Sequence, residues 1–139
     1  MVQLIVGKKG KGKTKQLLDK VNSEVKEIPG SIVYLDKNAK HMYELNNKVR
    51  LVDVSQFMLE STSEFLGFVC GVVSQDHDLQ QIYFDSFLTI AFLEGKDITP
   101  IIEKLEKLSA SFDVDFILSV SLDEAELSDS LKEKVIVSL

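Results

Sequence analysis

Apolar residues along this chain fall into two alternating patterns. Short continuous apolar runs predict buried strands, and stretches with apolar residues every three or four positions predict amphipathic helices. The strand runs are residues 2–6, 31–35, 49–54, 82–85, 115–121 and 135–139. The helical spacing covers residues 15–28, 38–47, 62–75 and 97–112, and a loop with an acidic helical turn occupies residues 122–131. Strands and helices therefore alternate along most of the chain.

This alternation predicts an α/β fold of one domain, residues 1–139. The expected architecture is a three-layer α/β/α sandwich with a mainly parallel sheet. Thr62 or Ser63 is the expected cap of the third helix, and Asp97 or Thr99 begins the fourth, with Pro100 in its first turn. Ligands of such sheets bind beyond the carboxyl ends of the strands, so residues that directly follow strands are the candidates for chemistry.

The segment after the first predicted strand carries the most specific motif. Residues 7–14, Gly-Lys-Lys-Gly-Lys-Gly-Lys-Thr, match the phosphate-binding pattern G-x-x-x-x-G-K-[ST] between a strand and a helix. Glycines let backbone amides converge on phosphate oxygens, Lys13 supplies positive charge, and Thr14 offers a hydroxyl to Mg²⁺. The predicted nucleotide-binding residues are Gly7, Lys8, Lys9, Gly10, Lys11, Gly12, Lys13 and Thr14. The alternative is a flexible surface turn.

A phosphate-bound Mg²⁺ also needs a carboxylate at the end of a neighbouring apolar strand. Asp85 fits best because it directly follows an apolar run. The predicted magnesium ligands are therefore Thr14 and Asp85. The predicted catalytic residues are Lys13 and Asp85. Asp36 is the alternative ligand, and Asp53 is a weaker one. Each of these carboxylates is also compatible with a polar residue that only ends a strand at a turn.

Together these residues resemble the P-loop NTPases, in the branch with an extra strand between the P-loop strand and the strand that ends in the magnesium aspartate. The resemblance implies the strand order 5-1-4-3-2 and a γ-phosphate sensor at Ser119 or Ser121. Serines that only end a strand are the simpler interpretation of both. The chain is also similar to short stand-alone bacterial P-loop proteins that are distantly like twitching-motility ATPases.

The sequence departs from active members of that branch. Ser86 stands where a water-positioning glutamate is common, and the nearest downstream acid, Glu94, is expected on a helix that faces elsewhere. The acidic and histidine boxes of the twitching-motility ATPases have no counterpart. The only arginine, Arg50, is predicted at the far end of its strand, so a small-molecule kinase is disfavoured and an arginine finger would have to come from a second subunit.

Charge is distributed unevenly. Residues 1–26 hold seven lysines against Asp19 and Glu24, a net charge of +5. Since the whole chain has a net charge of −6, the remaining residues carry −11. A small basic end on an acidic body suits a nucleotide better than a nucleic acid. The longest apolar run, residues 65–73, is too short to span a bilayer, and we expect no signal peptide. The single cysteine, Cys70, is expected to be buried, and a reduced, cytoplasmic setting is expected.

The two histidines are not expected to form a structural metal site, because the neighbours in Asp76-His77-Asp78 rarely all bind one ion. The predicted function is binding of ATP or another nucleoside triphosphate with Mg²⁺, with weak or partner-dependent hydrolysis. One alternative is a nucleotide-gated module whose acidic loop, Asp123 to Asp129, meets a protein partner. Another is a domain that binds phosphate only.

Overall fold

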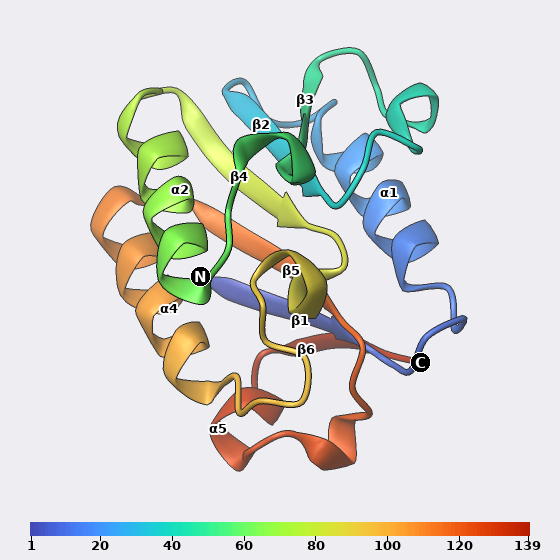
Figure 1. Cartoon of the computed structure of the whole chain (residues 1–139). Coiled ribbons are helices and arrows are strands. Elements are labelled where there is room, and N and C mark those ends of the chain that lie inside the picture. Colours follow the sequence, from blue (N-terminus) through green and yellow to red (C-terminus); the bar gives the residue numbers. More distant parts are fainter.

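Six parallel strands form the centre of the molecule in a computed structural model that describes residues 1–139 (Figure 1). The strands are β1 (Val2–Val6), β2 (Ser31–Asp36), β3 (Val49–Asp53), β4 (Leu79–Phe84), β5 (Asp115–Val120) and β6 (Val135–Ser138). Their order in the sheet is β3-β2-β4-β5-β1-β6. The predicted α/β class and parallel sheet are confirmed. The implied order 5-1-4-3-2 is obtained only when β3 is left out and the remaining strands are renumbered 1 to 5 along the chain, which gives β6-β1-β5-β4-β2.

Helices cover both faces of the sheet. The helices are α1 (Lys13–Glu24), α2 (Thr62–Ser74), α3 (Phe87–Ile90), α4 (Thr99–Phe112) and α5 (Asp129–Lys132), with 3-10 turns η1 (Met42–Glu44), η2 (Val54–Phe57) and η3 (Glu124–Glu126). Alternate residues of β1 point to opposite faces, so Ile5 packs in the cluster of α1 while Leu4 and Val6 pack in the cluster of α2 and α4. The result is a three-layer arrangement (Figure 1).

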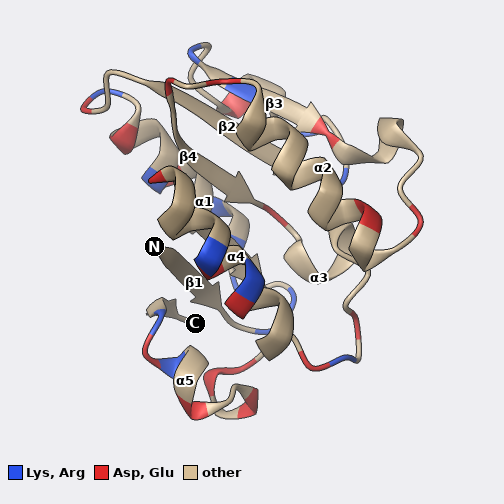
Figure 2. Ribbon diagram, turned by 90° about the vertical axis from the view of Figure 1, so that its left-hand side faces the viewer, with Lys and Arg blue, Asp and Glu red and all other residues tan.

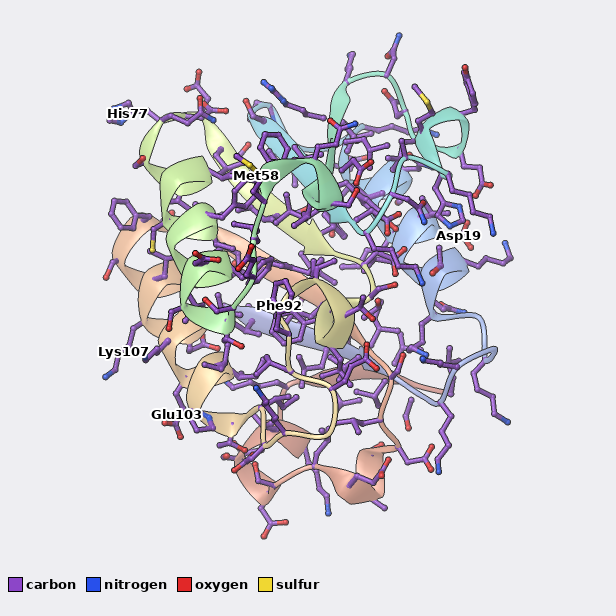
Figure 3. All side chains as sticks on the ribbon, in the orientation of Figure 1. Asp19, Met58, His77, Phe92, Glu103 and Lys107 are labelled. Carbon is purple, nitrogen blue, oxygen red and sulfur yellow. The ribbon has the colours of Figure 1, made fainter.

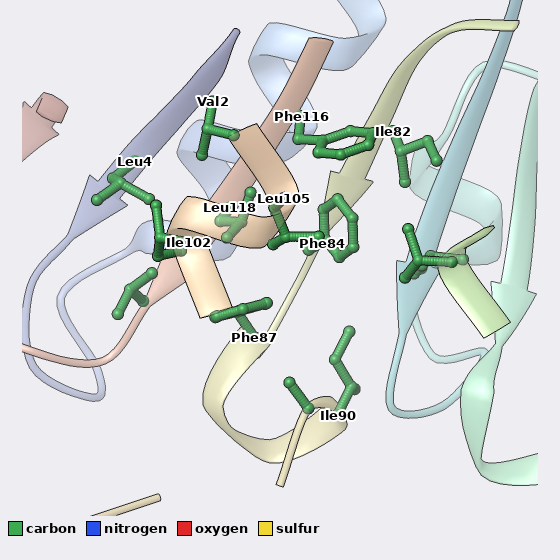
Figure 4. Close-up of a cluster of buried hydrophobic side chains, with 14 of the residues drawn as sticks. Val2, Leu4, Ile82, Phe84, Phe87, Ile90, Ile102, Leu105, Phe116 and Leu118 are labelled. Atoms are coloured by element: carbon green, nitrogen blue, oxygen red, sulfur yellow. The ribbon is translucent and has the colours of Figure 1, made fainter. Parts of the chain in front are cut away.

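A group of phenylalanine rings lies within the larger core, whose other side chains are aliphatic (Figure 4). Phe84 lies edge-on to Phe87 and Phe116, with ring centroids 6.0 and 5.5 Å apart, and Phe65 of α2 packs against Phe84 and Phe87. Because Phe84 and Phe87 flank Asp85, this packing fixes the point where β4 gives way to α3.

Three sequence-based expectations are wrong in detail. The segment 38–47 is mostly loop with the single turn η1, because it buries only Leu45. Cys70 is exposed on α2, since Phe65, Val69 and Val73 form the buried stripe of that helix and Cys70 is turned away from it. The cap of α2 is Ser61, whose side chain accepts the Glu64 amide, rather than Thr62 or Ser63.

Charged residues lie mainly on the helices and loops, and the strands are largely free of them (Figure 2). No helix in the structure has both the length and the apolar character that crossing a bilayer requires.

Replacing Phe65 with alanine should lower the free energy of unfolding by about 3–5 kcal/mol, because the ring is fully buried and its removal leaves a cavity. Denaturant unfolding followed by circular dichroism measures the change. Phe112→Ala is the matched control, because that ring is 57% exposed, and we expect a change of at most about 1 kcal/mol. Equal losses in the two variants would contradict this description of the core.

Candidate functional site

The loop between β1 and α1 is shaped by its glycines. Gly12 adopts the left-handed conformation, with φ 92°, directly before α1. Gly7 passes so close to Leu139 that a Cβ there would lie 3.0 Å from both the Cβ and the carbonyl oxygen of Leu139. Leu139 also donates its amide to the Val6 carbonyl at 2.9 Å, so the C-terminus lies beside this loop (Figure 1).

Several amides of this loop have no partner within the protein. The backbone N–H groups of Lys9, Gly10 and Gly12 donate no hydrogen bond, and all three residues are exposed and line the same cavity. The first turn of α1 adds its own free amides and the positive end of the helix dipole. Such a set of unpartnered donors beside one cavity is suited to an anion.

Lys13 adds a buried positive charge to these donors. The residue is only 7% exposed, and its Nζ donates to the carbonyl oxygen of Lys8 at 3.0 Å but forms no ion pair. Burial lowers the pKa of Lys13, the Asp85 carboxylate opposes that shift, and Lys9 adds to it. An anion in the cavity would supply the negative charge that Lys13 lacks.

Asp85 is the centre of a hydrogen-bond network at the carboxyl end of β4. Its Oδ1 accepts the Thr14 hydroxyl at 3.2 Å, the Ser119 hydroxyl at 2.9 Å and the Ser86 amide at 2.9 Å. Its Oδ2 accepts the Tyr34 hydroxyl at 2.8 Å. Burial and Asp85 together raise the pKa of Tyr34, so the phenol remains a donor. These four hydrogen bonds hold the carboxylate in one orientation.

Ser86 turns the chain out of β4. Its φ of 52° is unusual for a residue with a side chain, and its amide approaches both Asp85 Oδ1 and Ser119 Oγ at 2.9 Å. Strained backbone of this kind often marks functional sites. Here the conformation fixes the carboxylate and the serine hydroxyl relative to each other.

The predicted residues meet at a cavity of about 620 Å³, within the usual range for small-molecule sites. The predicted residues that line it are Lys9, Gly10, Gly12, Lys13, Thr14, Asp85, Ser119 and Ser121. Gly7, Lys8 and Lys11 do not line it, and Lys8 instead pairs with Asp123 at 3.6 Å. Ser119 holds Asp85, whereas Ser121 lines the cavity without such a bond. The mixture of charged, hydroxyl and backbone groups suits a polar, phosphate-bearing ligand.

Glu94 also lines this cavity, contrary to the expectation that it faces elsewhere. It lies in the loop after α3 rather than on a helix, and the Thr89 hydroxyl donates to its Oε1 at 3.0 Å. The short helix α3 was not predicted, and it turns this loop back toward the loop 7–12. The spacing of apolar residues in the sequence does not indicate that the chain after α3 comes back to this cavity.

Asp36 lies next to this network, at the carboxyl end of β2. The residue is 2% exposed, its Oδ1 accepts the Lys37 amide at 2.7 Å, and its Oδ2 has no partner. Burial, followed by the nearby Asp85, raises the pKa of Asp36 to about 6, while the Lys37 amide, His41 and the Lys37 charge oppose the shift. The third candidate, Asp53, accepts the Ser55 amide and hydroxyl and lies outside the cavity.

No protein-family model and no curated protein sequence matches this chain.

Replacing Asp36 with asparagine should stabilise the metal-free protein at pH 7.5. The raised pKa means that the folded state binds the Asp36 proton more tightly than the unfolded state, so ionisation above pH 6 costs stability. We expect a gain of about 1 kcal/mol. The gain should shrink as the pH falls from 7 through 6 to 4. Denaturant unfolding in EDTA measures it, and a less stable variant at pH 7.5 would contradict it.

Proposed function

We propose that this protein binds ATP or another nucleoside triphosphate, with Mg²⁺, in the cavity beside the loop 7–12. The observation that carries the proposal is the buried Lys13 ammonium, which has no ion pair and lies among unpartnered amides on a cavity wall. Phosphate oxygens would accept from the amides and neutralise the ammonium. The resemblance to P-loop NTPases supports the same proposal, as does the position of β5 between β1 and β4.

The residues around Asp85 fit a magnesium ion. Thr14 and Asp85 already lie in hydrogen-bond contact, and both offer oxygen atoms, the ligands that Mg²⁺ prefers. The ion would add positive charge to bound phosphates. In this proposal Thr14 and Asp85 hold the ion directly or through water, and Ser119 keeps Asp85 oriented.

Hydrolysis in this proposal is slow or depends on a partner. Glu94 is a carboxylate on the cavity wall that is suited to orient or deprotonate water, and the Thr89 hydroxyl holds it. The only arginine, Arg50, lies near the amino end of the edge strand β3, far along the strand from the carboxyl end where the site is. A second subunit or partner protein would have to supply an arginine, a group worth about 10³–10⁵ in rate in related chemistry.

A nucleotide-gated interaction module is a second candidate, favoured by contacts between the P-loop and the acidic loop. The Gly7 amide donates to the Leu122 carbonyl at 2.8 Å, and Lys8 pairs with Asp123. Leu122 also lines the cavity, directly before Asp123, so occupancy of the cavity would alter the acidic loop. This function and slow hydrolysis are compatible.

ATP with Mg²⁺ should raise the melting temperature of the protein, and Lys13→Ala should abolish the rise. At a nucleotide concentration of about 100 times Kd, we expect a shift of roughly 5–10 °C. Lys15→Ala is the matched control, because Lys15 is an exposed lysine of α1 that pairs with Asp19, and it should keep the shift. Differential scanning fluorimetry measures all three proteins. No shift in the unmodified protein would refute nucleotide binding, and an equal shift with inorganic phosphate would favour phosphate binding alone.

Glu94→Gln should lower ATP turnover at least tenfold while leaving stabilisation by ATP unchanged, because it removes a base but no predicted phosphate contact. Phosphate release measured with a coupled assay gives the rate. Glu103→Gln, an exposed position of α4 (Figure 3), is the control and should keep the full rate. Turnover in Glu94→Gln equal to that of the unmodified protein would remove Glu94 from the mechanism.

A further inference from the structure

Three metal-ligand side chains gather beside the nucleotide cavity. Asp36, His41 and Asp85 each offer a ligand atom, and these atoms all lie within 4.8 Å of one another. Asp36 and Asp85 come from the carboxyl ends of the paired strands β2 and β4, and Leu35 and Phe84, which precede them, are register partners. His41 comes from the loop that follows β2. The topology therefore brings the three together from two neighbouring strand ends.

One carboxylate oxygen of this cluster lacks any partner. Asp36 Oδ1 already accepts an amide, whereas the buried Oδ2 accepts nothing. A buried carboxylate oxygen without a donor is costly, and the cost grows with a second carboxylate nearby. Lys37 donates its backbone amide here, but its side chain forms no ion pair with Asp36. A bound cation would provide the missing partner.

His41 is positioned as a ligand by contacts behind it. Its Nδ1 lies 3.3 Å from Glu44 Oε2, which leaves Nε2 for a metal ion. Asn22 of α1 holds the same turn, because its side chain donates to the Glu44 carbonyl and accepts the Asn46 amide, each at 2.8 Å. A carboxylate behind a ligating imidazole fixes the ring orientation and raises its basicity.

We propose that Asp36, His41 and Asp85 bind a divalent transition-metal ion, of the zinc, manganese or iron class, in the absence of nucleotide. One imidazole nitrogen and two carboxylates suit these ions, whereas Mg²⁺ prefers oxygen ligands only. Ligand atoms of a four-coordinate zinc ion lie about 3.3 Å apart, so the present separations need only a modest contraction. This site differs from the magnesium position at Thr14, although both use Asp85, and it does not depend on nucleotide binding.

Titration of the untagged protein with Co²⁺, followed by visible absorption, tests the site directly. All proteins carry Cys70→Ser, which removes the only thiol. We expect one bound Co²⁺ with a spectrum distinct from that of the hydrated ion, and displacement by Zn²⁺. His41→Ala and Asp36→Asn should each weaken binding at least tenfold. His77→Ala is the matched control, because His77 lies at the opposite, amino end of β4 (Figure 3), and it should bind as the parent does.

Two further measurements distinguish loss of this metal site from loss of folding and from loss of nucleotide binding. Denaturant unfolding of Asp36→Asn should show a protein at least as stable as the parent, so weaker metal binding in that variant is not due to unfolding. Lys13→Ala should keep Co²⁺ binding while losing stabilisation by ATP, whereas His41→Ala should show the reverse. A hydrated-ion spectrum in the parent, or unchanged affinity in both His41→Ala and Asp36→Asn, would overturn the proposal without affecting nucleotide binding.

Discussion

The Asp85 carboxylate is the interaction on which the site depends. Its four hydrogen bonds come from the first helix, from β2, from β5 and from the turn after β4. Segments far apart in the sequence are thus joined at one buried charge. The packing of the larger core fixes the position of Asp85, because Phe84 and Phe87 lie on either side of it in the chain and are fully buried. Loss of that packing would displace the carboxylate and every donor that it holds.

Opposite charges remain unbalanced on the two sides of Asp85. Toward the loop 7–12, the Lys13 ammonium is buried without an ion pair. Toward β3, Asp36 is buried with an unpartnered oxygen. Neither residue forms a salt bridge. An anion on the first side and a cation on the second would relieve both costs, which is the common physical basis of the two sites that we propose.

The sequence predicted the architecture well, because strict alternation of buried strands and amphipathic helices leaves few topologies for a parallel sheet. It also identified Lys13, Thr14 and Asp85 as candidate site residues, since glycine spacing and a carboxylate after an apolar strand are local signals. It missed Tyr34 and misplaced Glu94. Tyr34 lies within an apolar strand and resembles a core residue, and Glu94 reaches the cavity through a return of the chain after α3. The positions of Tyr34 and Glu94 in the site depend on three-dimensional contacts, which hydrophobic periodicity and motif spacing in the sequence do not indicate.

His41 is another residue whose surroundings could not be predicted from hydrophobic periodicity. Its loop has weak apolar periodicity, which suggested a helix, yet the chain there is held by Asn22 and Glu44 rather than by a buried stripe. The polar contacts that hold this loop, where a helix was predicted, also orient the imidazole toward Asp36 and Asp85. Because Asp85 is shared, an ion on the His41 side and an ion with phosphates on the Thr14 side would compete for or polarise the same carboxylate. Any resulting change in affinity has to be reciprocal, since linkage between two sites is a single coupling free energy.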